Sequence, residues 1–123
     1  MIKVYVAGKY SDTNVVDVLK NIGIGETIAA ELFGIGFAPF CPWHDKDFII
    51  KCPSAIFTVE QFYEYSIVWL KCCDCVLLVP GWETSKGTLE EIRIAKENGI
   101  PVFETMTELN EFRKVTEQLS KLK

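Results

Sequence analysis

The residues best suited to chemistry lie between Cys75 and Glu91. An apolar, β-branched run over 75–79 predicts a buried strand, which a Pro-Gly pair ends. The residues Ser-Lys-Gly at 85–87 stand where the next helix should begin. In an open α/β sheet, ligands bind between the carboxyl end of a strand and the next helix, and a helix N-terminus favours an anion. The spacing therefore indicates a site for a sugar or sugar phosphate, with Glu91 as the acid beside it.

Helical spacing distinguishes the two adjacent acids of this segment. Glu91 shares a stripe with Gly87 and Ile94, which is the face expected to meet the sheet. Glu90 shares its stripe with Arg93, as on a solvated face. The inward direction of the Glu91 carboxylate needs an explanation, because burying an unpaired charge costs free energy. Two reasons remain open: a catalytic role as nucleophile or base, and a structural role in which a neighbouring hydroxyl or amide binds the acid.

The first expected strand, 2–7, supplies a second group of candidates. Tyr5 should lie near the carboxyl end of the sheet, where Glu91 is one possible partner for its hydroxyl; the alternative is a core tyrosine bonded to backbone. The loop after this strand, where backbone can approach a ligand, supplies Gly8, Lys9 and Tyr10. The chain lacks the G-x-G-x-x-G pattern of dinucleotide-binding folds.

The loop before Glu91 adds three binding candidates. Ser85 is either a helix N-cap or a phosphate ligand, and both roles use the same geometry. Gly87 belongs to the same helix start, and Trp82 stands in an expected exposed loop where it could cover a base or a ring. The five cysteines form no C-x-x-C pair and the chain has one histidine, so neither a zinc site nor another cofactor is expected.

Strands alternate with helices along the chain, which predicts an α/β fold with a parallel sheet. The last helix should pack on the sheet, Pro39 marks the second strand as an edge, and Gly23 and Gly25 indicate a bend or a close approach to the sheet. The expected strands are 2–7, 35–40, 75–79 and 100–103; the expected helices are 14–34, 59–71, 87–98 and 106–122; and 41–58 is expected to be a long loop.

Composition limits the class of protein. A chain of 123 residues with 49% hydrophobic residues predicts one folded domain over 1–123. A net charge of −4 without a basic stripe argues against a nucleic-acid polymer and leaves a mononucleotide open. Unpaired cysteines and a strand at the very start indicate a cytoplasmic protein. No apolar run approaches the ~20 residues needed to span a membrane.

Taken together, these motifs resemble the nucleoside 2-deoxyribosyltransferase superfamily, and are most similar to its small, mostly uncharacterised bacterial and phage branch. The likeness lies in Lys-Val-Tyr-Val-Ala-Gly-Lys-Tyr-Ser at 3–11, in Gly-Phe-Ala-Pro-Phe-Cys-Pro at 36–42, and in 73–87 followed by Glu91. It covers 2–42 and 69–103. The combined motif is specific for the superfamily and much less so for the reaction.

The resemblance implies a flavodoxin-like, Rossmann-like three-layer sandwich with a four- or five-stranded parallel sheet. It assigns Glu91 as the catalytic nucleophile and Tyr5 as the tyrosine that orients it, and it places Gly8 and Lys9 in the substrate loop. Ser85 matches the serine that meets the 5′-phosphate in related nucleoside-monophosphate N-glycosidases, whereas transferases of free nucleosides typically have an aspartate there. A homodimer or higher homo-oligomer is implied, because family members commonly complete each site with a neighbouring subunit.

The sequence departs from the superfamily at Ser66, where an aspartate usually positions or protonates the leaving base. We expect an N-glycosidase or deoxyribosyltransferase that cleaves a nucleoside or nucleoside 5′-monophosphate through a covalent glycosyl-glutamate. The positive end of its own helix should favour the ionised form of Glu91 that attack requires. The alternative is a catalytically impaired nucleotide-binding or sensing module. A third possibility is a small interaction protein with a vestigial crevice.

Overall fold

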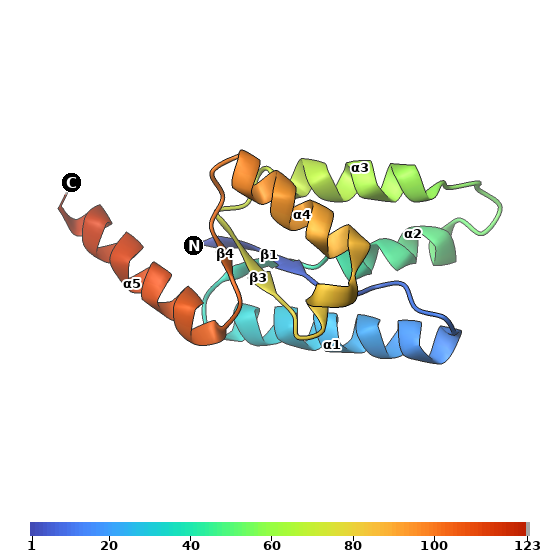
Figure 1. The fold of residues 1–123 in the computed structure, drawn as a ribbon, viewed down its shortest axis with the longest axis horizontal. Coiled ribbons are helices and arrows are strands. Elements are labelled where there is room, and N and C mark those ends of the chain that lie inside the picture. The colour runs from blue at the N-terminus through green and yellow to red at the C-terminus, as the bar shows by residue number, and fades with distance from the viewer. Residues whose placement is uncertain (123) are drawn as a thin grey trace.

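The computed structural model describes residues 1–122, which form four strands, five α-helices and two short 3₁₀-helices (Figure 1). In chain order these are β1 Lys3–Ala7, α1 Val15–Gly34, β2 Ala38–Phe40, η1 Pro42–Asp45, α2 Lys46–Lys51, α3 Val59–Leu70, β3 Cys75–Leu78, η2 Trp82–Thr84, α4 Lys86–Glu97, β4 Val102–Phe103 and α5 Met106–Lys121. Within the described part of the chain, no helix combines the length and apolar character needed to cross a bilayer.

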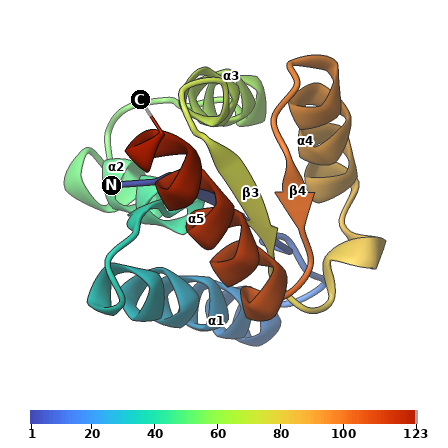
Figure 2. The ribbon, with the colours of Figure 1, turned by 90° about the vertical axis from the view of Figure 1, so that its left-hand side faces the viewer.

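The four strands form one parallel sheet in the order β2-β1-β3-β4. Helix α1 covers one face, and α3 and α4 cover the other (Figures 1 and 2). The flavodoxin-like three-layer arrangement is therefore confirmed with four strands, and β2, which contains Pro39, lies at an edge as expected. From β1 the chain continues to β2 on one side of the sheet, and from β3 it continues to β4 on the other side. In such a sheet, the ligand-binding crevice is expected at the carboxyl ends of these two central strands.

Strand β1 is buried on both faces and divides the core into two clusters. Val4 and Val6 belong to the cluster beneath α1, while Tyr5 and Ala7 belong to the cluster beneath α3 and α4. Successive side chains of a strand point to opposite faces, and all four residues are at most 1% exposed. This alternation fixes Tyr5 on the face that α4 covers.

The sequence predicted one long loop over 41–58, and this prediction is wrong. The segment contains η1 and α2, which together span 42–51. These helices are too short to produce a hydrophobic period, and α2 buries none of its residues. Trp43 anchors the segment: it is 1% exposed, and its Nε1 donates a hydrogen bond of 3.2 Å to the backbone oxygen of Lys9.

Helix α5 packs on the rest of the fold only near its beginning. Leu109 is its one buried residue, and Met106 and Phe112 pack against the cluster beneath α1. Val115 and Leu119 are 53% and 57% exposed, and the C-terminal end of the helix projects away from the sheet (Figure 1). The expectation that this helix packs against the sheet is therefore confirmed only for its first half.

Helix α1 runs without interruption through its two glycines. Gly25 approaches Trp43 rather than the sheet: a Cβ built on Gly25 would lie 2.5 Å from Cδ2 and 2.6 Å from Cζ3 of that indole. Nothing lies within 4 Å of the equivalent position on Gly23. Gly25 thus makes room for the residue that anchors segment 41–58.

The two glycines predict opposite effects of the same substitution. Gly25→Ala should lower the free energy of unfolding by about 2 kcal/mol, because the new methyl group overlaps a fully packed indole. Gly23→Ala should raise it by about 0.5–1 kcal/mol, because alanine favours the helix and meets no atom. Urea denaturation of both variants measures the difference. Equal effects would contradict the packing described for Trp43.

Candidate active site

The hydroxyl of Tyr5 lies where β1, α3 and α4 meet. Tyr5 is fully buried, and both the carboxylate of Glu91 on α4 and the hydroxyl of Ser66 on α3 lie close enough to influence its pKa. Among the described residues, none completes a hydrogen bond of good geometry with this hydroxyl. A buried polar group left unsatisfied costs roughly 1–3 kcal/mol. The structure therefore brings together three predicted site residues, with the Tyr5 phenol facing both partners without a hydrogen bond of good geometry to either.

Burial dominates the electrostatics of Glu91. The side chain keeps partial contact with solvent, yet desolvation raises the pKa of its carboxyl to about 7, and the Tyr5 phenol opposes this rise. Burial outweighs the helix dipole, which was expected to favour the ionised form, because the dipole acts mainly within the first turn and Glu91 is the sixth residue of α4. Burial, reinforced by Glu91, raises the pKa of Tyr5 well above its usual value, so the phenol remains a proton donor.

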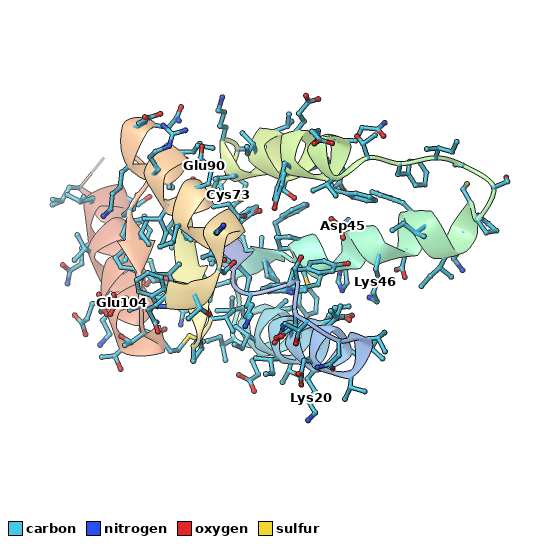
Figure 3. All side chains as sticks on the ribbon, turned by 45° about the vertical axis from the view of Figure 1, so that its right-hand side comes forward. Lys20, Asp45, Lys46, Cys73, Glu90 and Glu104 are labelled. Carbon is cyan, nitrogen blue, oxygen red and sulfur yellow. The ribbon has the colours of Figure 1, made fainter. Side chains whose placement is uncertain are left out.

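Glu90, the neighbouring acid, lies on the solvent face as the spacing predicted. Its Oε2 accepts a hydrogen bond of 2.9 Å from Nε of Arg93, which also pairs with Glu97. This hydrogen bond lowers the pKa of Glu90. Figure 3 shows Glu90 on α4. The two adjacent carboxyls therefore have pKa values shifted in opposite directions, and their environments explain both shifts.

Ser85 is the N-cap of α4. Its Oγ accepts hydrogen bonds of 3.2 Å from the backbone nitrogen of Thr88 and 2.9 Å from Oγ1 of Thr88. The capping role is thus observed. Because Ser85 accepts both bonds, its own hydroxyl hydrogen remains available, so capping and binding of an anion at this helix start are compatible.

Tyr63 of α3 is a residue that the sequence interpretation missed. A Cβ built on Gly87 would lie 3.5 Å from Cε1 of Tyr63, so this ring lies beside the beginning of α4. Tyr63 precedes Ser66 by three residues and therefore shares its face of the helix, which is the signal that could have identified it. Trp82 does not stand in an exposed loop as expected: it is half-buried and packs against the cluster that contains Tyr5.

The loop after β1 has structural contacts of its own. A Cβ on Gly8 would lie 2.6 Å from Cβ of Val79, so only glycine fits against the end of β3. Nζ of Lys9 forms an ion pair of 3.3 Å with Asp12. Both residues lie at the carboxyl end of β1, as predicted, and Lys9 already has a partner for its charge.

Tyr10 lies apart from Glu91. It packs against the cluster beneath α1, and its pKa is raised by burial and by Asp45, Asp47 and Glu26. Figure 3 shows Asp45 and Lys46 at the start of α2, apart from Glu90 on α4. Asp45 is buried, which raises the pKa of its carboxyl. The structure therefore does not bring Tyr10 together with Tyr5 and Glu91.

A family model described as a domain of unknown function, DUF4406, matches residues 2–104. The chain belongs to this family. No protein of curated function matches it. The matched span contains all four strands and α1–α4, and hence every candidate site residue, whereas α5 lies beyond it.

The DUF4406 domain offers no obvious metal centre within residues 1–122, because no three His, Cys, Asp or Glu side chains gather there in a way that would hold an ion. One surface hollow lies along α5 and another along α1, and neither borders Glu91. The chemistry available at the site is thus that of a carboxyl with a pKa near neutrality, a phenol donor and serine hydroxyls.

The raised pKa of Glu91 predicts a pH-dependent gain in stability on its replacement. The carboxyl holds its proton to about pH 7 in the folded state but only to about 4.5 when unperturbed, so it destabilises the fold progressively as pH rises between these values. Glu91→Gln should exceed the wild type in free energy of unfolding by about 2–3 kcal/mol at pH 8 and by less than about 1 kcal/mol at pH 5.

Denaturation at both pH values measures this difference, and Glu90→Gln on the exposed face is the matched control. The control should change stability little and equally at both pH values, as expected for an exposed ion pair. A gain for Glu91→Gln that is the same at both pH values would show that Glu91 titrates normally.

Proposed function

We propose that the protein is an N-glycosidase or deoxyribosyltransferase that cleaves the N-glycosidic bond of a nucleoside or nucleoside 5′-monophosphate. The observation that carries this proposal is the pairing of a desolvated carboxyl, Glu91, with the unsatisfied hydroxyl of Tyr5 at the ligand-binding end of the sheet. The resemblance to nucleoside 2-deoxyribosyltransferases assigns these two residues to the nucleophile and to its orienting tyrosine.

The proposed chemistry is that of a retaining glycosidase. One oxygen of the Glu91 carboxylate attacks C1′ as the bond to the base breaks, and a covalent glycosyl-glutamate forms through an oxocarbenium-like transition state. The Tyr5 phenol donates to the other oxygen and holds the carboxylate in position. Water then releases the sugar in a hydrolase, and a second base does so in a transferase. Attack requires the ionised form of Glu91, so the rate should rise with pH through about 7.

A monophosphate fits the beginning of α4 better than a free nucleoside does. Ser85 keeps a free hydroxyl hydrogen there, Lys86 is exposed at the first position of the helix, and the helix dipole favours a negative group. The ring of Tyr63 lies beside the same helix start.

A nucleotide-binding or sensing module is the second candidate, and Ser66 favours it. Departure of a base is assisted by a proton donor, and a serine hydroxyl is too weak an acid for that task. Ser66 lies beside Tyr5, in the place where the resemblance leads one to expect an aspartate. In this alternative the crevice retains the ligand without breaking its bond.

We also place the protein in the cytoplasm, because its five cysteines are all unpaired, and we propose that it works as a homodimer or higher homo-oligomer. Its ligand is a small molecule rather than a nucleic-acid polymer, in keeping with the net charge of −4.

Incubation with a panel of nucleosides and nucleoside monophosphates, followed by chromatography of free bases, tests the enzymatic proposal. The wild type should release base at a rate that increases from pH 6 to pH 8, and Glu91→Gln should reduce release by at least about 10³-fold, because the nucleophile is lost. Release by Glu91→Gln at the wild-type rate would rule out this role. Calorimetric binding without release would identify the sensor, and absence of binding would favour a vestigial crevice.

Ser85→Asp should reverse the preference between the two substrate classes. Aspartate retains the N-cap but repels a 5′-phosphate, so kcat/KM for the monophosphate should fall by about 10-fold or more relative to that for the free nucleoside. The folded state should be unaffected, whereas Ser85→Ala should lose about 1 kcal/mol of stability with the cap. An unchanged ratio of the two kcat/KM values would place the phosphate elsewhere.

A further inference from the structure

The loop 8–14, which connects β1 to α1, is attached to the rest of the fold through two of its backbone oxygens. The oxygen of Lys9 accepts a hydrogen bond of 3.2 Å from Nε1 of Trp43, which lies in η1. The oxygen of Tyr10 accepts one of 3.3 Å from Nδ2 of Asn21, which lies in α1. Two successive carbonyl groups of the loop therefore point toward η1 and α1.

Both side chains that donate these hydrogen bonds are held in place. The indole of Trp43 lies between two glycines: Gly25 approaches it from α1, and a Cβ built on Gly8 would lie 3.2 Å from its Cζ2. Asn21 is half-buried, and its Nδ2 donates a second hydrogen bond, of 3.4 Å, to Oδ2 of Asp12. The loop is thus attached to two side chains that have little freedom to move.

The direction of the two carbonyl groups determines where the neighbouring N–H groups point. A trans peptide places its C=O and its N–H on opposite sides, and no peptide bond in residues 1–122 is cis. The N–H of Tyr10 shares a peptide plane with the oxygen of Lys9, and the N–H of Ser11 shares one with the oxygen of Tyr10. Both N–H groups therefore point away from Trp43 and Asn21. Within the described chain, neither of them has a hydrogen-bond acceptor.

These two N–H groups lie at the carboxyl end of β1, where the crevice of the sheet is expected. The loop begins beside the end of β3, because a Cβ on Gly8 would lie 2.6 Å from Cβ of Val79. Figure 1 shows the loop above α1, on the side of that helix where α2, α3 and α4 lie. A direction away from α1 is therefore a direction toward the crevice.

We propose that Trp43 and Asn21 are positioning residues of the candidate site. They hold the loop so that the N–H groups of Tyr10 and Ser11 donate hydrogen bonds to oxygen atoms of a bound sugar or sugar phosphate. Donors that are fixed before binding reduce the entropy cost of ordering them. This inference rests on the proposed function, from which it takes the sugar as the ligand. It gives Tyr10 a part in the site through its main chain, although its side chain packs beneath α1.

Nuclear magnetic resonance of the isotopically labelled full chain, titrated with 2-deoxyribose 5-phosphate, tests the inference. This probe has no base, so the base preference of the protein does not affect the result. The amide signals of Tyr10 and Ser11 should shift on binding. Asn21→Leu, which keeps the shape of the side chain but removes its N–H donors, should weaken binding by about 5-fold or more. It should also lower the order parameters of the loop from about 0.85 toward the range below about 0.6 that is typical of a flexible backbone.

Asn110→Leu is the matched control for this substitution. Asn110 is half-buried, as Asn21 is, and its Oδ1 also takes part in a hydrogen bond, with Arg113, but it lies on α5. The control should bind the probe as the wild type does and should leave the order parameters of the loop unchanged. Equal effects of the two substitutions would overturn the positioning role of Asn21.

Trp43→Phe provides a second variant, since it removes Nε1 but keeps an aromatic ring beside Gly25. It should weaken binding and loosen the loop as Asn21→Leu does, while circular dichroism shows it folded. Unchanged affinity in both variants, or amide signals of Tyr10 and Ser11 that do not shift when the wild type binds, would overturn the inference and leave the proposed function standing. A wild type that shows these responses but releases no base from any nucleotide would support the inference and contradict the enzymatic proposal. A wild type that does not bind the probe would contradict both.

Discussion

The candidate site depends on the double burial of β1. Because both faces of this strand are covered, the two-residue alternation of its side chains leaves no freedom in which of them faces α4. A slip of one residue would turn the phenol of Tyr5 toward α1 and present a valine to Glu91. The pairing of β1 with β3, in which Tyr5 lies opposite Val76, places that phenol level with the strand that leads into α4. The geometry of the site is thus a consequence of sheet register.

Two features that lower the stability of the fold occur together at this site. Desolvation raises the pKa of Glu91 to about 7, and the buried hydroxyl of Tyr5 lacks a good hydrogen bond. A purely structural glutamate would be expected to complete the hydrogen bonds of the polar groups beside it. Ser85 does so when its Oγ accepts two hydrogen bonds from Thr88 and caps α4. Local conflicts that the rest of a fold tolerates are typical of functional sites. The contrast between these neighbours is the physical basis for the proposal that Glu91 and Tyr5 are functional.

The sequence predicted those parts of the fold that leave a periodic signal. The long helix α1, the buried strand β3 and the opposite faces of Glu90 and Glu91 all follow from spacing along one element. Contacts between distant residues leave no such signal. The fit of Trp43 against Gly25 and the approach of Tyr63 to Gly87 depend on how separate helices are placed. The raised pKa of Glu91 was equally inaccessible, because the spacing gives the direction of a side chain but not the depth of its burial.

Of the three elements that form the site, α3 has the fewest buried residues. Tyr5 is set by the sheet, and α4 is fixed by the buried Thr88, Ile94 and Ala95. Helix α3 contributes Ser66 and Tyr63; its Leu70 is buried, and its Tyr65 and Trp69 pack against Phe40 of β2. The positions of Ser66 and Tyr63 relative to Tyr5 and Gly87 therefore depend on the packing of these aromatic rings against Phe40, which itself stacks on Tyr5.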